Sequence, residues 1–85
     1  MNYQDALNEG LKILKFNNIK SFLLDSELLL SYSLNLERSE LILNLDKKLS
    51  EKEYIRFFSY INRRKKKEPI AYIIGYKEFW KKKFK

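Results

Sequence analysis

The sequence contains no cysteine and no histidine. Without cysteine the chain can form no disulfide, no zinc–thiolate site and no thiol nucleophile. Without histidine it also lacks the usual base of a Ser-His or Cys-His arrangement and a common nitrogen ligand of zinc. These two absences remove most of the catalytic and metal sites that a short chain could carry. They also fit the reducing cytoplasm, which is the location that we predict.

Glycine and proline are scarce as well, with two residues and one residue respectively. Gly10 and Gly75 are far apart, so no glycine-rich loop is available to hold a phosphate or a nucleotide cofactor. Apolar runs such as Leu28–Leu30 are far too short to span a membrane. The amino end also lacks the basic and apolar regions of a signal peptide. We therefore expect no membrane partner and no cofactor bound by these residues.

The 85 residues are enough for one domain with a core, since 45% of them are hydrophobic. The net charge of +7 is unevenly distributed along the chain. Residues 1–61 contain eight Lys or Arg and nine Asp or Glu, whereas residues 62–85 contain ten and two, so the two parts carry −1 and +8. A solvated helix end rich in lysine and a binding surface would both account for this pattern.

Hydrophobic periodicity predicts an all-α fold, a small bundle of about five helices. The first helix is expected at about Tyr3–Phe16, with Asn2 as its N-cap. Asn17 and Asn18 should end it, because asparagine tolerates the left-handed conformation. Gly10 lies inside this helix and would permit a close crossing with another one.

The second helix, from Ser21 as N-cap to about Leu34, is apolar around most of its circumference, so we expect it to be central. Asp25 and Glu27 are the exceptions. They could act as an acid/base pair, or each could pair with a basic residue of a neighbouring helix. Residues two apart do not share a helix face, which favours the structural interpretation.

The third helix is expected at Ser39–Leu45, with Ser39 as N-cap and with Leu41, Ile42 and Leu45 inward. The fourth begins at Ser50, whose spacing to Glu53 is that of a capping box. An apolar stripe follows at helical spacing and consists of Tyr54, Phe57, Phe58 and Ile61. Such a stripe could stack on nucleic-acid bases, but it more often forms part of a core.

The segment Glu68–Trp80, EPIAYIIGYKEFW, contains the only proline and the only tryptophan. Pro69 disfavours helix at the residue before it and can open a new short helix, Ile70–Ile74. Gly75 can end that helix by adopting a positive φ. The remaining residues, Tyr76–Lys85, alternate aromatics with lysines and favour a strand or hairpin.

The same segment carries a family resemblance. The pattern R-R-x-x-x-E-P-I-A-Y-I-I-G-x-x-E-F-W is formed by Arg63, Arg64, Glu68–Gly75 and Glu78–Trp80. Upstream, Asp25–Leu30 follows D-x-E-L-L-L. Together they resemble the N-terminal domain of bacterial protein-glutamine N5-methyltransferases, the PrmC/HemK family, which methylate class-1 peptide chain release factors. Two positions depart from it, because Lys67 and Lys81 stand where the family usually or often has glycine.

The resemblance implies that residues 1–75 form a release-factor-recognition domain and that residues 76–85 begin a β-hairpin linker to an α/β catalytic domain. That domain would bind S-adenosylmethionine and methylate the glutamine of the Gly-Gly-Gln motif. Its Asn-Pro-Pro-Tyr signature needs two adjacent prolines, which this chain does not have. We therefore assign no catalytic, cofactor-binding or metal residue here and expect an excised N-terminal domain of the enzyme.

The basic run is the candidate surface for a release factor, as an exposed patch of Arg63, Arg64, Lys65, Lys66 and Lys67. A structural role is assigned to Asp25, Glu27, Pro69, Tyr72, Gly75, Phe79 and Trp80. Tyr72 and Ile73 are expected to pack inward, and Phe79 and Trp80 to pack against the catalytic domain.

Two other functions remain open. A small basic nucleic-acid-binding module would explain the +8 segment and its interleaved aromatics, Tyr76, Phe79, Trp80 and Phe84. The helical body is close to neutral, however, and shows no helix-turn-helix spacing with a basic recognition helix. Direct nucleic-acid binding is therefore the alternative hypothesis. A free-standing interaction bundle is the third.

Overall fold

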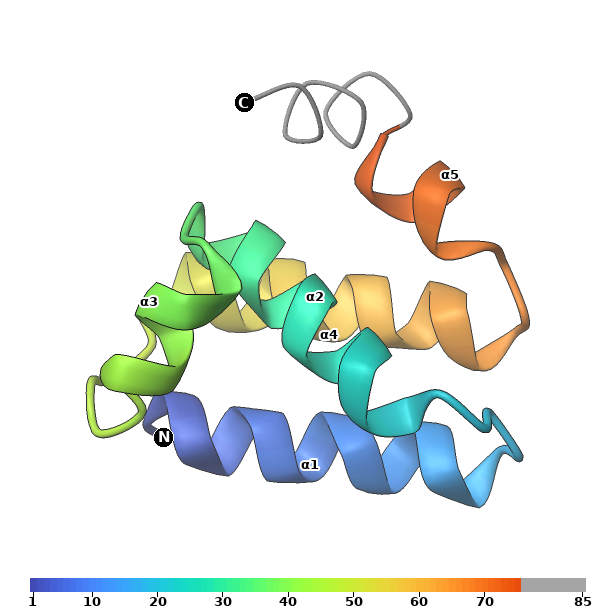
Figure 1. Cartoon of the computed structure of the whole chain (residues 1–85), viewed down its shortest axis with the longest axis horizontal. Helices are drawn as coiled ribbons and strands as arrows, with labels where there is room; N and C mark the ends of the chain where they lie inside the picture. The colour runs from blue at the N-terminus through green and yellow to red at the C-terminus, as the bar shows by residue number, and fades with distance from the viewer. Residues whose placement is uncertain (76–85) are drawn as a thin grey trace.

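The computed structural model describes residues 1–75, which form five helices and no strand (Figure 1). The helices are α1 (Tyr3–Phe16), α2 (Phe22–Leu34), α3 (Arg38–Leu43), α4 (Glu51–Lys65) and α5 (Ile70–Ile74). The predicted all-α bundle of about five helices is therefore confirmed. The predicted hairpin falls on residues 76–85, outside the described residues.

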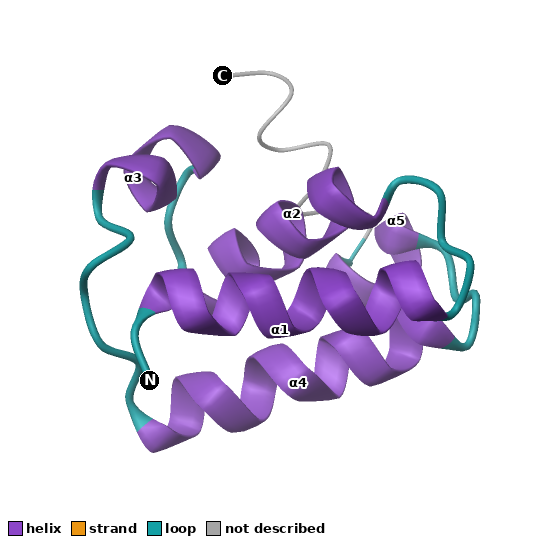
Figure 2. Cartoon of the chain, turned by 90° about the horizontal axis from the view of Figure 1, so that it is seen from below, coloured by secondary structure: helices purple, strands orange, loops and turns teal. Residues whose placement is uncertain are grey.

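The second helix, α2, is central, as predicted, because it contacts each of the other four helices. Figures 1 and 2 show α1 and α4 lying side by side and running in the same direction, while α2 crosses them in the opposite sense. The short α3 covers one end of α2, and α5 packs against α2 and α4. Within residues 1–75, no helix has both the length and the apolar character needed to cross a membrane.

Both long outer helices begin at the predicted N-caps. The side-chain oxygen of Asn2 accepts a hydrogen bond from the amide of Asp5 at 2.8 Å. At the start of α4, Ser50 Oγ accepts from the amide of Glu53 at 3.2 Å, and the Glu53 carboxylate accepts from the amide of Ser50 at 2.9 Å. These reciprocal bonds satisfy amides of the first turn that have no partner inside the helix.

The third helix, α3, begins earlier than predicted. Glu37, rather than Ser39, is its N-cap, and the amide of Glu37 donates to the Glu40 carboxylate at 3.0 Å. The predicted inward position of Ile42 is also wrong, since 46% of this residue is exposed while Leu41 is fully buried. Leu41 is the one buried residue of α3, so the side of this six-residue helix that packs on α2 is narrow and Ile42 lies outside it.

Three helix ends place a residue other than glycine at positive φ: Asn18 at 63°, Asn35 at 58° and Lys67 at 74°. In each case an amide beyond the end bonds back to the last turn, as in a Schellman motif. The end of α1 at Asn17 and Asn18 therefore agrees with the prediction. Gly75, at φ 88°, ends α5 with the expected positive φ.

The core lies where α1, α2 and α4 meet, and side chains of α4 pack directly against Gly10 of α1. A Cβ atom added at Gly10 would lie 2.7 Å from Cζ of Phe57 and 3.1 Å from Cδ1 of Ile61. Both side chains are almost completely buried, with 0% and 1% exposure. They cannot turn out of the way, so the close crossing depends on glycine.

We predict that Gly10→Ala lowers the free energy of unfolding by about 1 kcal/mol. Alanine gains about 1 kcal/mol in helix propensity, but overpacking a filled core typically costs about 1–3 kcal/mol. Urea denaturation followed by circular dichroism measures the difference.

Two further variants separate the two effects. Asn8→Ala, on an exposed position of the same helix, should gain propensity without a clash. Combining Gly10→Ala with Phe57→Leu should cost about 1 kcal/mol less than the sum of the single changes, because leucine leaves room for the new methyl group. Additive costs would contradict the proposed contact.

Candidate partner-binding surface

The C-terminal end of α4 holds the basic run Arg63–Lys67 and the turn that leads to α5. The amide of Lys67 donates to the carbonyl of Arg64 at 2.8 Å, and the amide of Glu68 donates to the carbonyl of Arg63 at 3.3 Å. This bonding requires the intervening residue, Lys67, to adopt its φ of 74°. The position at which the family resemblance expects glycine is therefore a left-handed position, and lysine occupies it here at a conformational cost.

Arg64 is directed inward to α2. Its Nε donates to Oδ2 of Asp25 at 2.8 Å, and the same carboxylate oxygen accepts from Ser21 Oγ at 2.8 Å. The exposed fractions of the two charged side chains are only 19% for Arg64 and 6% for Asp25. Arg64 Nη1 also donates to the carbonyl of Glu68 at 3.0 Å, so one guanidinium joins α2, α4 and the turn before α5.

Arg63 forms the second link across this turn. Its Nε donates to Oε1 of Glu68 at 3.0 Å, its Nη2 pairs with the other carboxylate oxygen, and Nη2 also lies 3.5 Å from the carbonyl of Tyr72. The hydrogen bond from Arg63 lowers the pKa of Glu68 below its ordinary value. Both arginines thus attach the α4–α5 connection to the bundle.

Asp25 and Glu27 belong to different contacts, so they form no joint acid/base site. Glu27 accepts from Nε of Arg38 on α3 at 3.1 Å, and half of the Arg38 side chain is exposed. Each carboxylate therefore pairs with a basic residue outside α2, as the structural interpretation predicts.

The structure corrects the idea that the whole basic run is one exposed patch. Arg63 and Arg64 are partly buried by the contacts above, and Lys65 is partly buried as well. Of the five residues of the run, Lys66 and Lys67 are exposed. Moreover, Nζ of Lys67 donates to the carbonyl of Asn17 at 3.0 Å, which joins the end of α4 to the end of α1. Lys65 and Lys66, which form no ion pair or side-chain hydrogen bond within residues 1–75, are therefore the members of the run that are available to a partner.

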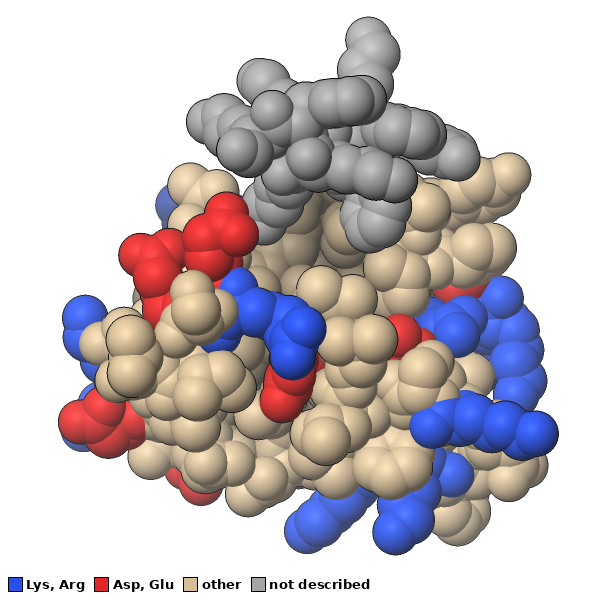
Figure 3. All heavy atoms as spheres, in the orientation of Figure 1, with Lys and Arg blue, Asp and Glu red and all other residues tan. Residues whose placement is uncertain are grey.

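The ends of α1 and α4 bring more lysines together than the sequence analysis identified. Figure 3 shows basic side chains gathered over this part of the visible face and acidic ones mainly towards α3. We call the group the basic end, and it consists of Lys12, Lys15, Lys20, Lys65, Lys66 and Lys67. Within residues 1–75 none of these six lysines forms an ion pair.

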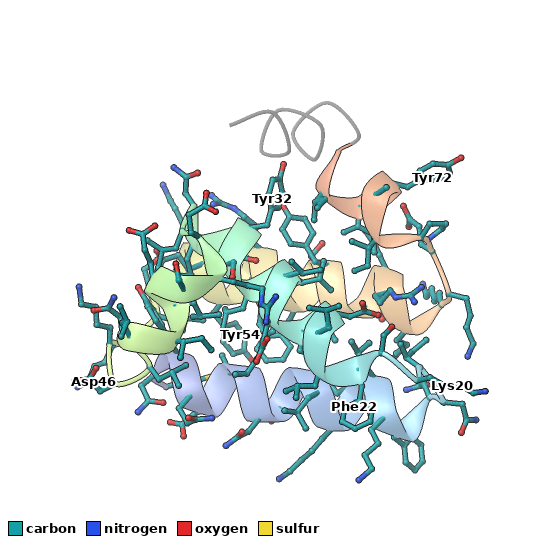
Figure 4. The ribbon with its side chains drawn as sticks, viewed as in Figure 1. Lys20, Phe22, Tyr32, Asp46, Tyr54 and Tyr72 are labelled. Atoms are coloured by element: carbon teal, nitrogen blue, oxygen red, sulfur yellow. The ribbon has the colours of Figure 1, made fainter. Side chains whose placement is uncertain are left out.

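The candidate surface predicted from the sequence did not include Lys12, Lys15 and Lys20, although their position around the end of the first predicted helix could have indicated them. Lys12 and Lys15 lie in the second half of α1, and Lys20 follows its end (Figure 4). Lysine near a helix C-terminus is ordinarily explained by the helix dipole. The C-terminal ends of α1 and α4 form one surface because the two helices are parallel.

The residues around α5 are placed as follows. Pro69 precedes α5 with φ −60°, and Ile70–Ile74 is helical, as predicted. Ile73 is buried, but the prediction that Tyr72 packs inward is wrong, because 67% of Tyr72 is exposed and its ring points away from the bundle (Figure 4). Ile73 and Ile74 form the buried side of α5, and Tyr72, about 100° away from Ile73, lies outside that side and faces solvent. Phe79 and Trp80 lie outside the described residues.

Hollows and clusters of acidic side chains are the features of residues 1–75 that could hold a small ligand or a metal ion. Within the described part of the chain, no three acidic side chains are placed to hold a metal ion. One polar hollow of about 410 Å³ is lined by Tyr32, Asn35, Arg56 and Tyr60. The Tyr32 and Tyr60 rings lie 5.6 Å apart, and Arg56 Nη1 donates to the carbonyl of Ser33 at 2.9 Å. A second hollow lies between α1 and α4 and is described below.

Comparison with known families gives one match. A family model for the PrmC N-terminal domain matches residues 5–75. No solved structure matches the chain.

Several curated relatives are methyltransferases. A release factor glutamine methyltransferase of Clostridium acetobutylicum is 42% identical over 79 residues, which cover 93% of the chain and 28% of that protein. The corresponding enzyme of Clostridium botulinum is 40% identical over 76 residues, with 89% and 27% covered. A bifunctional methyltransferase of Rickettsia felis is 46% identical over 66 residues, with 78% and 12% covered. The chain therefore spans less than a third of the length of these relatives.

We predict that Asp25→Asn lowers the free energy of unfolding by about 3 kcal/mol, because it leaves a largely buried Arg64 without its counter-charge. Glu27→Gln is the matched control on the same helix, since its partner Arg38 is half exposed. It should cost less than about 1 kcal/mol. Chemical denaturation of both variants measures the difference, and equal losses would show that burial of the Asp25 pair has no special effect.

A second prediction concerns the strained position at the end of α4. Lys67→Ala removes the hydrogen bond to Asn17 but keeps a Cβ atom at positive φ, whereas Lys67→Gly removes both. We expect the glycine variant to be more stable than the alanine variant by about 1 kcal/mol, because only glycine adopts this φ freely. Thermal or urea unfolding of the pair tests this, and an alanine variant of equal or greater stability would contradict it.

Proposed function

The chain belongs to the family of PrmC N-terminal domains, and on that premise we propose that it is the substrate-recognition domain of a release factor glutamine methyltransferase. The full enzyme would transfer a methyl group from S-adenosylmethionine to the side-chain amide of the glutamine in the Gly-Gly-Gln motif of class-1 peptide chain release factors. The names of the two clostridial relatives support this substrate. We place the reaction in the cytoplasm.

The chemistry would belong to a domain that is not part of these residues. The chain matches at most 28% of the length of the relatives described above. Catalytic and S-adenosylmethionine-binding residues would follow in a catalytic domain, connected through the residues after Gly75. The bundle itself would bind the body of the release factor and orient it.

A recognition domain without catalytic residues can still accelerate the reaction. Contacts far from the reacting atom supply binding energy that holds a large substrate in a productive position. For a protein substrate, this requires a surface that is complementary to the substrate and not already used by the fold.

The basic end is the observation that carries this proposal. Its six lysines have no carboxylate partner within residues 1–75, whereas all three ion pairs described there use arginine. Lysines in water contribute little to stability but attract an acidic partner over long distances. Such charges raise the association rate more than the intrinsic affinity.

The test compares a complete release factor with a short peptide that contains Gly-Gly-Gln, using the full-length methyltransferase. Lys12→Glu combined with Lys66→Glu should raise KM for the release factor about tenfold with kcat unchanged, because association is weakened while the chemistry is untouched. Methylation of the peptide, which is too short to reach the bundle, should not change.

The control reverses two exposed lysines at the other end of the molecule, Lys48→Glu with Lys52→Glu, and should leave KM for the release factor within about twofold. An unchanged KM in the basic-end variant would overturn the proposed role of that end. A salt-sensitive affinity for duplex nucleic acid that exceeds the affinity for the release factor would favour the nucleic-acid-binding alternative.

A further inference from the structure

A hollow of about 410 Å³ is lined by residues of α1 and α4, the two helices that lie side by side in Figure 2. Its lining comes from both helices and consists of Ile13, Phe58, Ser59, Ile61, Asn62 and Lys65. Three of these residues are apolar, and Lys65 of the basic end belongs to the lining. The hollow therefore combines an apolar floor with a positive charge at one end.

Exposed apolar side chains extend this hollow along both helices. Phe16 follows Ile13 by three residues, and Ile55 precedes Phe58 by three, so each pair lies on one side of its helix. The exposed fractions are 87% for Phe16 and 60% for Ile55. Tyr54, whose ring lies 4.8 Å from that of Phe58, is 43% exposed. We call this hollow with its extension the α1–α4 groove.

Basic and acidic side chains are unevenly distributed along the α1–α4 groove. The hydrogen bond from Lys67 to Asn17 joins the two helices at the basic end. Towards the other end, helical spacing places two carboxylates on the groove side, Glu9 four residues before Ile13 and Glu51 seven residues before Phe58. An occupant of the groove therefore meets apolar side chains along its length and an excess of lysines at one end.

The α1–α4 groove is also separate from the element that leads out of the described residues. The last helix, α5, packs on α2 and α4, whereas the lining of the hollow comes from α1 and α4 and includes no residue of α5. Within residues 1–75, α5 therefore does not fill the groove.

We propose that the α1–α4 groove binds an amphipathic helix of the protein substrate, with carboxylates at the end that lies over the basic end. Its apolar face would enter between Ile13 and Phe58, in the manner of helices that bind to grooves through residues spaced three and four apart. This inference rests on the proposed function and names the surface through which recognition takes place.

Other occupants fit the groove less well. A second copy of the chain would bring Glu9 and Glu51 against six lysines and would leave most of the positive charge unneutralised. A nucleic-acid backbone would neutralise the lysines, but phosphates gain nothing from an apolar floor. An acidic amphipathic helix satisfies both parts of the surface.

The first experiment is an NMR titration of the ¹⁵N-labelled 85-residue chain with a class-1 release factor. Shifts or line broadening should concentrate at Ile13, Phe16, Ile55, Phe58 and Lys65. Changes concentrated on α2 or α3 would overturn the groove but leave the proposed function standing. No change at any residue would count against both.

The second experiment compares affinities of single variants by titration calorimetry. Phe16→Ser and Lys65→Glu should each weaken binding of the release factor about tenfold, as expected for an apolar contact and a charged contact that both lose water on binding. Leu43→Ser, at a residue that is 81% exposed on α3, and Lys52→Glu, at the other end of α4, are the matched controls and should change affinity less than about twofold.

Two results would assign the groove to another occupant and overturn the proposal. One is dimerisation of the free chain in sedimentation experiments that is abolished by Phe16→Ser. The other is binding of duplex RNA to the same groove amides with an affinity equal to that of the release factor.

Discussion

The buried pair between Asp25 and Arg64 is the constraint on which the arrangement of this bundle depends. Taking two charges out of water is costly, and their attraction does little more than compensate for it. The main effect of the pair is therefore on geometry, because the 2.8 Å contact between Arg64 Nε and Asp25 Oδ2 links a defined position on α4 to a defined position on α2. The same guanidinium holds the carbonyl of Glu68, so fixing α4 also fixes the turn that leads to α5.

The fixed end of α4 explains why lysines gather where they do. With Arg64 directed inward and Arg63 bound to Glu68, the chain turns back at Lys67, whose side chain reaches the end of α1. The arginines and the lysines of this region have different roles because their side chains differ in chemistry. Arginine presents a planar set of donors suited to fixed pairs, whereas lysine is a strongly hydrated point charge on a flexible stem. The arginines of the run hold the fold through ion pairs, whereas its lysines form no ion pair within residues 1–75 and only Lys67 among them bonds to another helix end.

Much of this fold follows from local sequence, because the relevant interactions are local. The capping boxes at Asn2 and Ser50, and the left-handed residue after α1, depend on residues at most five apart. The errors arise where tertiary contacts decide. Ile42 and Tyr72 are apolar or aromatic residues on short helices, and the burial of either one depends on which side meets a neighbour. Likewise, no linear pattern joins Lys12 to Lys66, since the parallel packing of α1 and α4 alone brings them together.

The basic end and the α1–α4 groove would act on different steps of recognition. Exposed lysines act over about a Debye length and speed the first encounter, but salt and water weaken them once contact is made. Apolar side chains such as Phe16 act only on contact, where excluding water slows dissociation. A bundle that had only the lysines would bind a substrate quickly but release it quickly, and one that had only the apolar residues would associate with it slowly. Because Lys65 belongs to both surfaces, capture and retention would take place at adjoining positions on the same two helices.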